Sequence, residues 1–142
     1  MTVPSIEELF PGIMTVLSDG MVHELGEMRD RVADMLSLTD EDRSIMRPRG
    51  DMTVLYSNFS WAVSHLKGAR FISSPTRSHY RITPLGRRVL DRIGAEGVDK
   101  EFLNTFEDYR VFTHPVARKR VLDPEGYVNP FLVGLEEEEK ED

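Results

Sequence analysis

One stretch of the sequence, residues 53–67, combines an apolar face with a face of hydroxyl-bearing and basic side chains. Its apolar residues recur at the intervals of three and four that place them on one side of a helix. They are Leu55, Phe59, Ala62 and Leu66. The opposite side carries Tyr56, Ser57, Ser60, Ser64 and Lys67. This side has no carboxylate, and its groups can hydrogen-bond to base edges and phosphates. Because the major groove admits one helix, the segment is predicted to read duplex DNA.

Basic residues are concentrated around this segment, although the whole chain is acidic. The 142 residues carry a formal net charge of −7. Residues 43–88 hold nine basic residues and one acidic residue, a net charge of +8. Residues 1–42 have a net charge of −8 and residues 89–142 one of −7. A basic region on an acidic body is the pattern expected of a face that binds a polyanion.

Residues before and after the helix extend the predicted contact surface with double-stranded DNA. Arg47 and Arg49 lie in the loop that enters the helix, where they can hold phosphates. A predicted hairpin after the helix supplies Arg77, His79 and Arg81. Asn58, on the flank of the helix, is included among the DNA-contacting residues. Trp61 on the same flank is predicted to pack against the protein, whereas Tyr56 suits contact and packing equally.

Other kinds of site lack the residues they need. The chain has no cysteine, which excludes a disulfide framework, a thiol nucleophile and a cysteine metal site. The four histidines are His23, His65, His79 and His114. They fall in different predicted elements and do not pair at ligand spacing, so neither a metal nor a cofactor is predicted.

The order of predicted elements favours a mainly α winged helix-turn-helix with a small β-hairpin. Helices are predicted at 6–17, 25–38, 39–45, 53–67, 84–93 and 98–113, with Ser5, Thr39 and Thr83 as N-caps. A short strand is predicted at 21–23, and hairpin arms at 71–73 and 79–83 flank a turn at 74–78. Helices followed by a two-stranded wing define this variant of the helix-turn-helix.

The chain is predicted to comprise a winged-helix DNA-binding domain at 1–95, a helical extension at 96–135 and an acidic, solvated tail at 136–142. The extension contains Phe102, Phe106, Tyr109, Phe112 and Phe131. These aromatic side chains could dock on a second copy of the chain in a homodimer, or on another subunit. The sequence shows neither a signal-peptide pattern nor a membrane-length apolar run, so we expect a cytoplasmic location without membrane contact.

Five short pieces between Val3 and Leu90 occur in a characteristic order and spacing. They are Pro4-Ser5-Ile6-Glu7-Glu8-Leu9; Leu17-Ser18-Asp19-Gly20; Leu38-Thr39-Asp40-Glu41-Asp42-Arg43; Trp61-Ala62 with Leu66-Lys67 and Ala69; and Tyr80-Arg81-Ile82-Thr83 with Gly86 and Leu90. Together they resemble the N-terminal domain of Mrr-type restriction endonucleases. The resemblance implies a winged-helix fold and a role in DNA recognition, in a family that targets modified DNA.

The sequence departs from that family on the predicted recognition surface. Ser57-Asn58 stands where family members usually have an Asn-Arg pair. Ala69-Arg70-Phe71 replaces an Ala-Gly-Leu ending of the helix, and Arg77-Ser78 replaces a glycine of the wing. The recognition surface is therefore expected to differ, which leaves its target open.

The nuclease chemistry of the family is not expected in this chain. The family's nuclease domain implies an Asp and a Glu/Gln-x-Lys motif that bind Mg²⁺. The chain has no Gln, and Glu138-Glu139-Lys140 lies in a charge run without a predicted strand. We therefore predict a non-catalytic DNA-binding module, either a regulator or the recognition part of a restriction or defence system with a separate nuclease. Two alternatives are a protein-interaction adaptor that uses the winged-helix scaffold and the C-terminal aromatics, and a DNA mimic suggested by the acidic charge.

Overall fold

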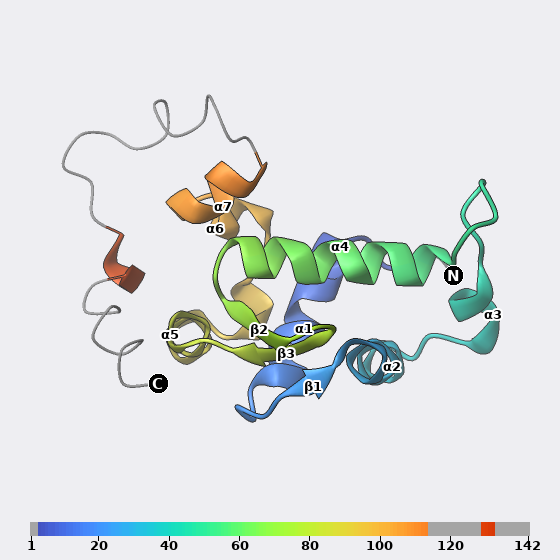
Figure 1. Cartoon of the computed structure of the whole chain (residues 1–142), viewed down its shortest axis with the longest axis horizontal. Helices are drawn as coiled ribbons and strands as arrows, with labels where there is room; N and C mark the ends of the chain where they lie inside the picture. The colour runs from blue at the N-terminus through green and yellow to red at the C-terminus, as the bar shows by residue number, and fades with distance from the viewer. Residues whose placement is uncertain (1–2, 114–128, 133–142) are drawn as a thin grey trace.

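The computed structural model describes residues 3–113 and 129–132, and its elements have the order of a winged helix (Figure 1). The helices are α1 (Phe10–Leu17), α2 (Leu25–Met35), α3 (Asp40–Ser44), α4 (Val54–Gly68), α5 (Pro84–Ile93), α6 (Lys100–Leu103) and α7 (Glu107–Thr113). Short 3₁₀ turns lie at Glu7–Leu9, Ala95–Gly97 and Pro130–Leu132. The strands are β1 (His23–Glu24), β2 (Ile72–Thr76) and β3 (His79–Ile82). The predicted fold class is confirmed.

The three strands form one antiparallel sheet in which β3 lies between β1 and β2. The hairpin of β2 and β3 turns at Arg77 and Ser78, and Ser78 has a φ of +62°. The predicted turn at 74–78 was too long, because the strand continues past Ser74 with a shift in register. The Ser74 hydroxyl donates to the carbonyls of Thr76 and His79, 2.7 and 2.9 Å away, and so satisfies backbone groups at this irregularity.

Side-chain caps confirm the predicted starts at Thr39 and Thr83, whereas the helix predicted to follow Ser5 begins as a 3₁₀ turn and α1 starts at Phe10. The Ser5 hydroxyl accepts from the Glu8 amide while the Glu8 carboxylate accepts from the Ser5 amide, at 3.2 and 2.9 Å. Thr39 and Asp42 cap α3 in the same reciprocal way. The Thr83 hydroxyl accepts from an amide in the first turn of α5. These caps satisfy amides that have no partner within the helix.

Two helices differ from their predicted lengths. The helix expected at 25–38 ends at Met35, and Ser37 beyond it has a φ of +57°. The helix expected at 98–113 is divided into α6 and α7. Between them, the Asn104 carbonyl accepts from the Arg110 guanidinium at 2.7 Å, and this side-chain bond takes the place of a helical one.

One hydrophobic core joins the N-terminal helices, α4, the sheet and the C-terminal helices. Its largest buried side chains are Phe10, Phe59, Phe71 and Phe106, with Leu9, Ile13, Met14, Leu17, Met28, Leu66, Ile72 and Leu85. Core residues therefore lie on both sides of the predicted boundary at residue 95. The predicted acidic tail at 136–142 lies outside the described residues. Among the described residues, no helix is long and apolar enough to cross a membrane.

The aromatic residues of the predicted extension pack largely within the chain itself. Phe106 and Tyr109 are buried, and the ring of Phe106 contacts Phe71 edge-on with centroids 5.0 Å apart. Phe131 completes this cluster against Phe106 at 5.8 Å. Phe112 keeps 41% of its surface exposed. Most of the aromatic area that was expected to dock on another subunit is therefore used in the fold of this chain.

Candidate nucleic-acid interface

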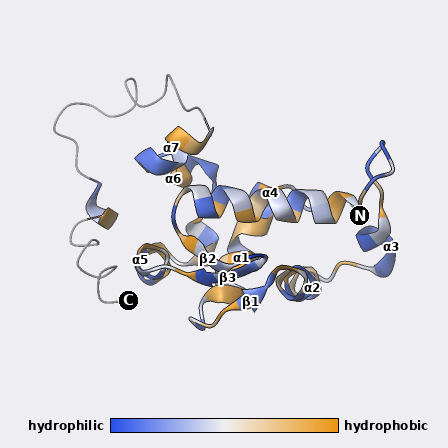
Figure 2. Cartoon of the chain, in the orientation of Figure 1, coloured by the Kyte–Doolittle hydropathy of each residue, from blue (hydrophilic) through white to orange (hydrophobic). Residues whose placement is uncertain are grey.

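Helix α4 presents the predicted polar face to the outside. Thr53 caps the helix by accepting from the Tyr56 amide at 3.1 Å. The predicted apolar face of Leu55, Phe59, Ala62 and Leu66 is buried, together with Val63. Figure 1 shows α4 running along the molecule, with the sheet on one side and α6 and α7 beside its C-terminal end. Figure 2 shows hydrophobic and hydrophilic residues alternating along α4, and a hydrophilic loop leading into it.

The outer face of α4 and the loop before it form a shallow depression, here called the helix hollow. It is lined by Arg47, Met52, Tyr56, Ser57, Ser60, Trp61 and Ser64. Five of the predicted DNA-contacting residues are thus brought together. No carboxylate lines the hollow, and among the described residues the three serine hydroxyls have no hydrogen-bond partner. Hydroxyls without a partner on an exposed helix face can donate hydrogen bonds to a ligand and accept them from it.

Trp61 corrects the prediction that this side chain packs inside the protein. It is 55% exposed and stands on the wall of the helix hollow. Its ring lies edge-on to that of His65, with the ring centroids 6.4 Å apart. The sequence spacing indicates this position, because Trp61 follows Ser57 by one helical turn and precedes Ser64 by another. It therefore shares their face rather than the buried one.

The flank of α4 behind Trp61 is closed by α7. The His65 Nδ1 lies 2.7 Å from the Tyr109 hydroxyl, and the ring of Phe112 lies 5.5 Å from the imidazole. Burial, assisted by the charge of Lys100, lowers the pKa of His65 below its usual value. Burial likewise raises the pKa of Tyr109. Both groups are therefore neutral near pH 7 and serve to pack α7 on α4.

The side chain of Tyr56, a residue of α4, lies near α2, so it is used partly within the protein and partly on the surface. Its side chain is 42% exposed, and the guanidinium of Arg29 from α2 lies 5.4 Å from the ring centroid. One ring face is thus used within the protein, and the exposed part lines the helix hollow. A cation over an aromatic ring is attracted by the negative face of the ring. Arg29, which the sequence did not single out, thus adds a basic residue next to the helix hollow.

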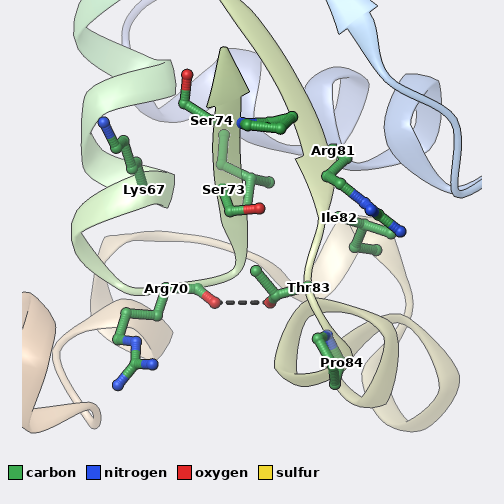
Figure 3. A pocket seen from close by; sticks show the side chains of 10 residues that line it. Lys67, Arg70, Ser73, Ser74, Arg81, Ile82, Thr83 and Pro84 are labelled. Carbon is green, nitrogen blue, oxygen red and sulfur yellow. Dashed lines mark hydrogen bonds between the residues drawn. The ribbon is translucent and has the colours of Figure 1, made fainter. Parts of the chain in front are cut away.

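A second depression, here called the hairpin hollow, lies between the end of α4 and the wing (Figure 3). It is lined by Lys67, Arg70, Ile72, Ser73, Ser74, Pro75, Arg81, Ile82, Thr83 and Pro84. Ser73 and Arg81 are cross-strand partners. Figure 3 shows Lys67 and Arg70 extending from the end of α4 on one side of Ser73, and Arg81 on the other. No carboxylate lines this hollow, so it can accept an anion.

The two walls of the hairpin hollow are fastened together at their base. The Thr83 hydroxyl donates to the carbonyls of Arg70 and Phe71, 2.7 and 3.0 Å away. Gly86 in α5 allows this approach, because a Cβ there would lie 2.1 Å from the Phe71 carbonyl oxygen. The junction therefore holds the turn after α4 against the end of β3, the two elements from which Lys67 and Arg81 extend on either side of the hollow.

The other predicted residues lie apart from the two hollows. Arg77 is exposed at the tip of the wing, and its carbonyl lies 2.9 Å from the His79 Nδ1. Arg49 is exposed in the loop before α4. The Asn58 amide donates to the Pro4 carbonyl at 3.0 Å, so it fastens the N-terminal segment to α4. The structure thus gives Asn58 a structural bond and leaves the two arginines at the edges of the surface.

Few charged groups of this surface are neutralised within the protein. In the described part of the chain, no ion pair involves Lys67, Arg81, Arg77 or Arg49. Arg47 lies 3.8 Å from Asp51, a separation typical of a weak surface pair. The described residues contain no group of three or more potential metal ligands. The arrangement can bind a polyanion by hydrogen bonds and charge, without a metal.

Comparison with known protein families gives a match that covers most of the elements described above. The sequence model of the Mrr N-terminal domain matches residues 7–92, which run from the first 3₁₀ turn to the end of α5 and include both hollows. The chain belongs to the Mrr N-terminal domain family. The resemblance of the sequence is thereby confirmed, and membership associates the chain with Mrr-type restriction systems. No curated protein and no solved structure matches it.

Proposed function

We propose that this Mrr N-terminal domain protein is a non-catalytic module that binds double-stranded DNA. The outer face of α4 enters the major groove, and the hairpin hollow, the wing tip and the arginines of the loop before α4 contact the phosphate backbone. One observation carries the proposal. Hydroxyl and cationic groups line the helix hollow and the hairpin hollow beside apolar ones, and neither hollow contains a carboxylate. A third depression, at the start of α4, does contain carboxylates, those of Asp30 and Asp51.

The acidic net charge of the chain does not oppose this proposal, because the charges are segregated. The basic segment 43–88 includes the loop before α4, α4 itself, the wing and the first half of α5. DNA attracts such a face over about a Debye length, which is roughly 8–10 Å at moderate salt. Acidic groups farther away are screened over that distance, so the local charge of the face governs binding.

The catalytic step is assigned to a nuclease outside this sequence. The family that matches is an N-terminal domain and not a nuclease domain. DNA and a separate nuclease or effector subunit are therefore the proposed partners, and the proposed location is the cytoplasm. A homodimer through residues 96–135 is proposed as well, with Phe112 of α7, 41% exposed, as an aromatic side chain available for the contact. Such a two-fold dimer would pair two DNA half-sites. Light scattering of the free protein measures its oligomeric state.

A salt titration of duplex binding tests the proposed function. A short fluorescently labelled duplex is titrated with the protein at several salt concentrations, and the anisotropy of the label is measured. We expect binding at low salt and a linear fall of log K with log salt, because each phosphate contact releases counterions. Absence of binding at the lowest salt would remove the proposal and favour the protein-interaction adaptor.

A further inference from the structure

The loop before α4 is a small β-hairpin whose arms meet at Met46 and Thr53. These two residues form an antiparallel bridge. Beside the bridge, the Arg47 amide donates to the Met52 carbonyl at 3.0 Å. Residues Met46–Thr53, here called the entry hairpin, project beyond the N-terminal end of α4 and clear of the sheet (Figure 1). The paired arms hold this segment in one shape, whereas the sequence predicted only a basic loop.

The entry hairpin is fastened to the first turn of α4. The Val54 amide donates to the Ile45 carbonyl at 2.9 Å, so the first residue of the helix is bonded to the chain just before the hairpin. Thr53 ends the second arm and is also the N-cap of α4, where its hydroxyl accepts from the Tyr56 amide. Arg47 of the first arm lines the helix hollow. The base of the hairpin therefore adjoins the face of α4 that is proposed to enter the major groove.

The tip of the entry hairpin is narrow. The Gly50 amide donates to the Arg47 carbonyl at 2.8 Å and closes a β-turn with Pro48 and Arg49 at its centre. Gly50 has a φ of +72°, which glycine adopts without strain, and open space surrounds the position that a Cβ would occupy. Since proline and glycine have no long side chain, Arg49 is the residue that extends from this turn.

Arg49 carries the uncompensated charge of the entry hairpin. Its side chain is exposed, and within residues 3–113 and 129–132 it makes no hydrogen bond or ion pair. The hairpin also contains Asp51, whose carboxylate lies 3.8 Å from the Arg47 guanidinium, so that arginine offsets its charge in part. The guanidinium of Arg49 thus offers all of its N–H donors to an external acceptor.

We propose that the entry hairpin places Arg49 in the minor groove of DNA, next to the major groove that holds α4. This inference rests on the proposed function. Arg47, near the base, keeps the phosphate contact, whereas Arg49 lies three residues farther along the chain than Met46. Three extended residues span up to about 10 Å, and the minor groove is roughly 7.5 Å deep, so the tip can reach the base edges.

The minor groove suits this tip in width and in chemistry. It is roughly 6 Å wide, so it admits a narrow turn with one long side chain but not a helix. A·T pairs present only acceptors there, which match a guanidinium, whereas G·C pairs add the N2 amino donor of guanine. Narrow A·T-rich grooves also have a stronger negative potential, which attracts arginine. Arg49 therefore selects A·T pairs beside the site that α4 contacts.

Inosine tests this proposal, because it lacks the N2 amino group of guanine and keeps the major-groove edge of guanine. Two labelled duplexes of one sequence, with either G·C or I·C pairs, are titrated by anisotropy. We expect the wild-type protein to bind the inosine duplex about fivefold more tightly, the effect of about one hydrogen bond. Arg49→Ala should bind both duplexes equally, with an unchanged Tm because the side chain is exposed. A general effect of inosine on duplex flexibility would persist in this variant.

Arg77→Ala is the matched control, because Arg77 is likewise an exposed arginine at the tip of a hairpin. Its loss should weaken binding to both duplexes by the same factor and lower the slope of log K against log salt by about 0.9. The preference for the inosine duplex should stay at its wild-type value.

Two results would overturn the assignment of Arg49 while wild-type DNA binding persists. The first is equal affinity of the wild-type protein for the two duplexes. The second is a preference for inosine that Arg49→Ala retains, and its loss in Arg77→Ala would then assign the minor groove to the wing. If the wild-type protein binds no duplex DNA at the lowest salt, the proposed function fails and the assignment of Arg49 fails with it.

Discussion

The polar side chains on the two flanks of helix α4 differ in whether they have partners inside the protein. On the α7 flank, polar groups have partners inside the protein, such as the 2.7 Å contact between His65 and Tyr109. On the hairpin flank, Lys67 and Arg81 face an open hollow without a carboxylate. Partnered polar groups stabilise a fold, whereas unpartnered cations cost little in water and remain ready for an external ligand. The α7 flank therefore has a structural role, and recognition is proposed for the hairpin flank.

The largest effect should come from the structural flank. Phe106→Ala removes a buried ring that packs on Phe71, so we expect a loss of about 3–5 kcal/mol in the free energy of unfolding. Phe112→Ala is the control, because this ring is 41% exposed and its loss should cost much less. Urea denaturation measures both variants. A loss in Phe106→Ala as small as that in Phe112→Ala would mean that the ring of Phe106 is not part of the common core.

The recognition flank should respond in affinity and not in stability. The double variant Lys67→Ala/Arg81→Ala removes two exposed cations, so urea denaturation should give nearly the wild-type free energy of unfolding. Duplex affinity at low salt should fall by more than about tenfold, and the salt slope by about 1.8.

Arg87→Ala controls for net charge in this experiment. Arg87 lies in the basic segment, but its guanidinium lies 3.5 Å from the Ser18 carbonyl, away from both hollows. Its replacement should leave duplex affinity close to that of the wild type. A similar loss of affinity in both variants would show that binding follows the total charge and not the hairpin flank.

Asn58 tests the comparison further. The sequence placed this residue in the contact surface, whereas the structure gives its side chain a hydrogen bond within the protein. Asn58→Ala removes the 3.0 Å bond to the Pro4 carbonyl. We expect a loss of about 0.5–1.5 kcal/mol in the free energy of unfolding and an unchanged salt slope. Thermal unfolding and the duplex titration measure the two quantities. Unchanged stability with weakened binding would return Asn58 to the recognition surface.

His23, a buried histidine in β1, supplies the smallest predicted effect. Burial of His23 favours the neutral ring, but bonds to Glu27 and Asp19 outweigh it and raise the pKa above 6.5. Its stabilising contribution is therefore full below that value and is lost as pH rises through the raised pKa. The Tm should fall with pH in this window, and His23→Gln should flatten that fall. His65 should show the opposite trend, because burial lowers its pKa. Charging of this buried ring below pH 6.5 costs stability, so its contribution to the Tm should rise with pH there.

The sequence predicted the elements whose signals are local. Caps such as Thr39 with Asp42, and the apolar spacing of α4, depend on residues within a turn or two of each other, so the starts of α3 and α5 and the buried face of α4 were right. The end of α2 and the break before α7 were missed. The break involves the Arg110 side chain and the Asn104 carbonyl, a contact that periodicity does not reveal.

The site was predicted in its composition and less well in its geometry. The predicted contact residues include Arg47, Tyr56, Ser57, Ser60 and Ser64 of the helix hollow, and Lys67 and Arg81 of the hairpin hollow. The hydroxyls of Ser73, Ser74 and Thr83 were not among them. The prediction missed the exposure of Trp61, because a large aromatic residue was assumed to pack, and it did not single out Arg70, which lines the hairpin hollow. It also assigned the C-terminal aromatics to a partner, since nothing local shows that Phe106 lies against Phe71.

The emission of Trp61 tests most directly the central claim that the outer face of α4 contacts DNA. Trp61 is the only tryptophan of the chain and is 55% exposed on that face. When the duplex is added at low salt, its emission should change and its access to acrylamide should fall, with the same Kd that the anisotropy of labelled duplex gives. Bound duplex that leaves both the emission and the acrylamide access of Trp61 unchanged would contradict the claim.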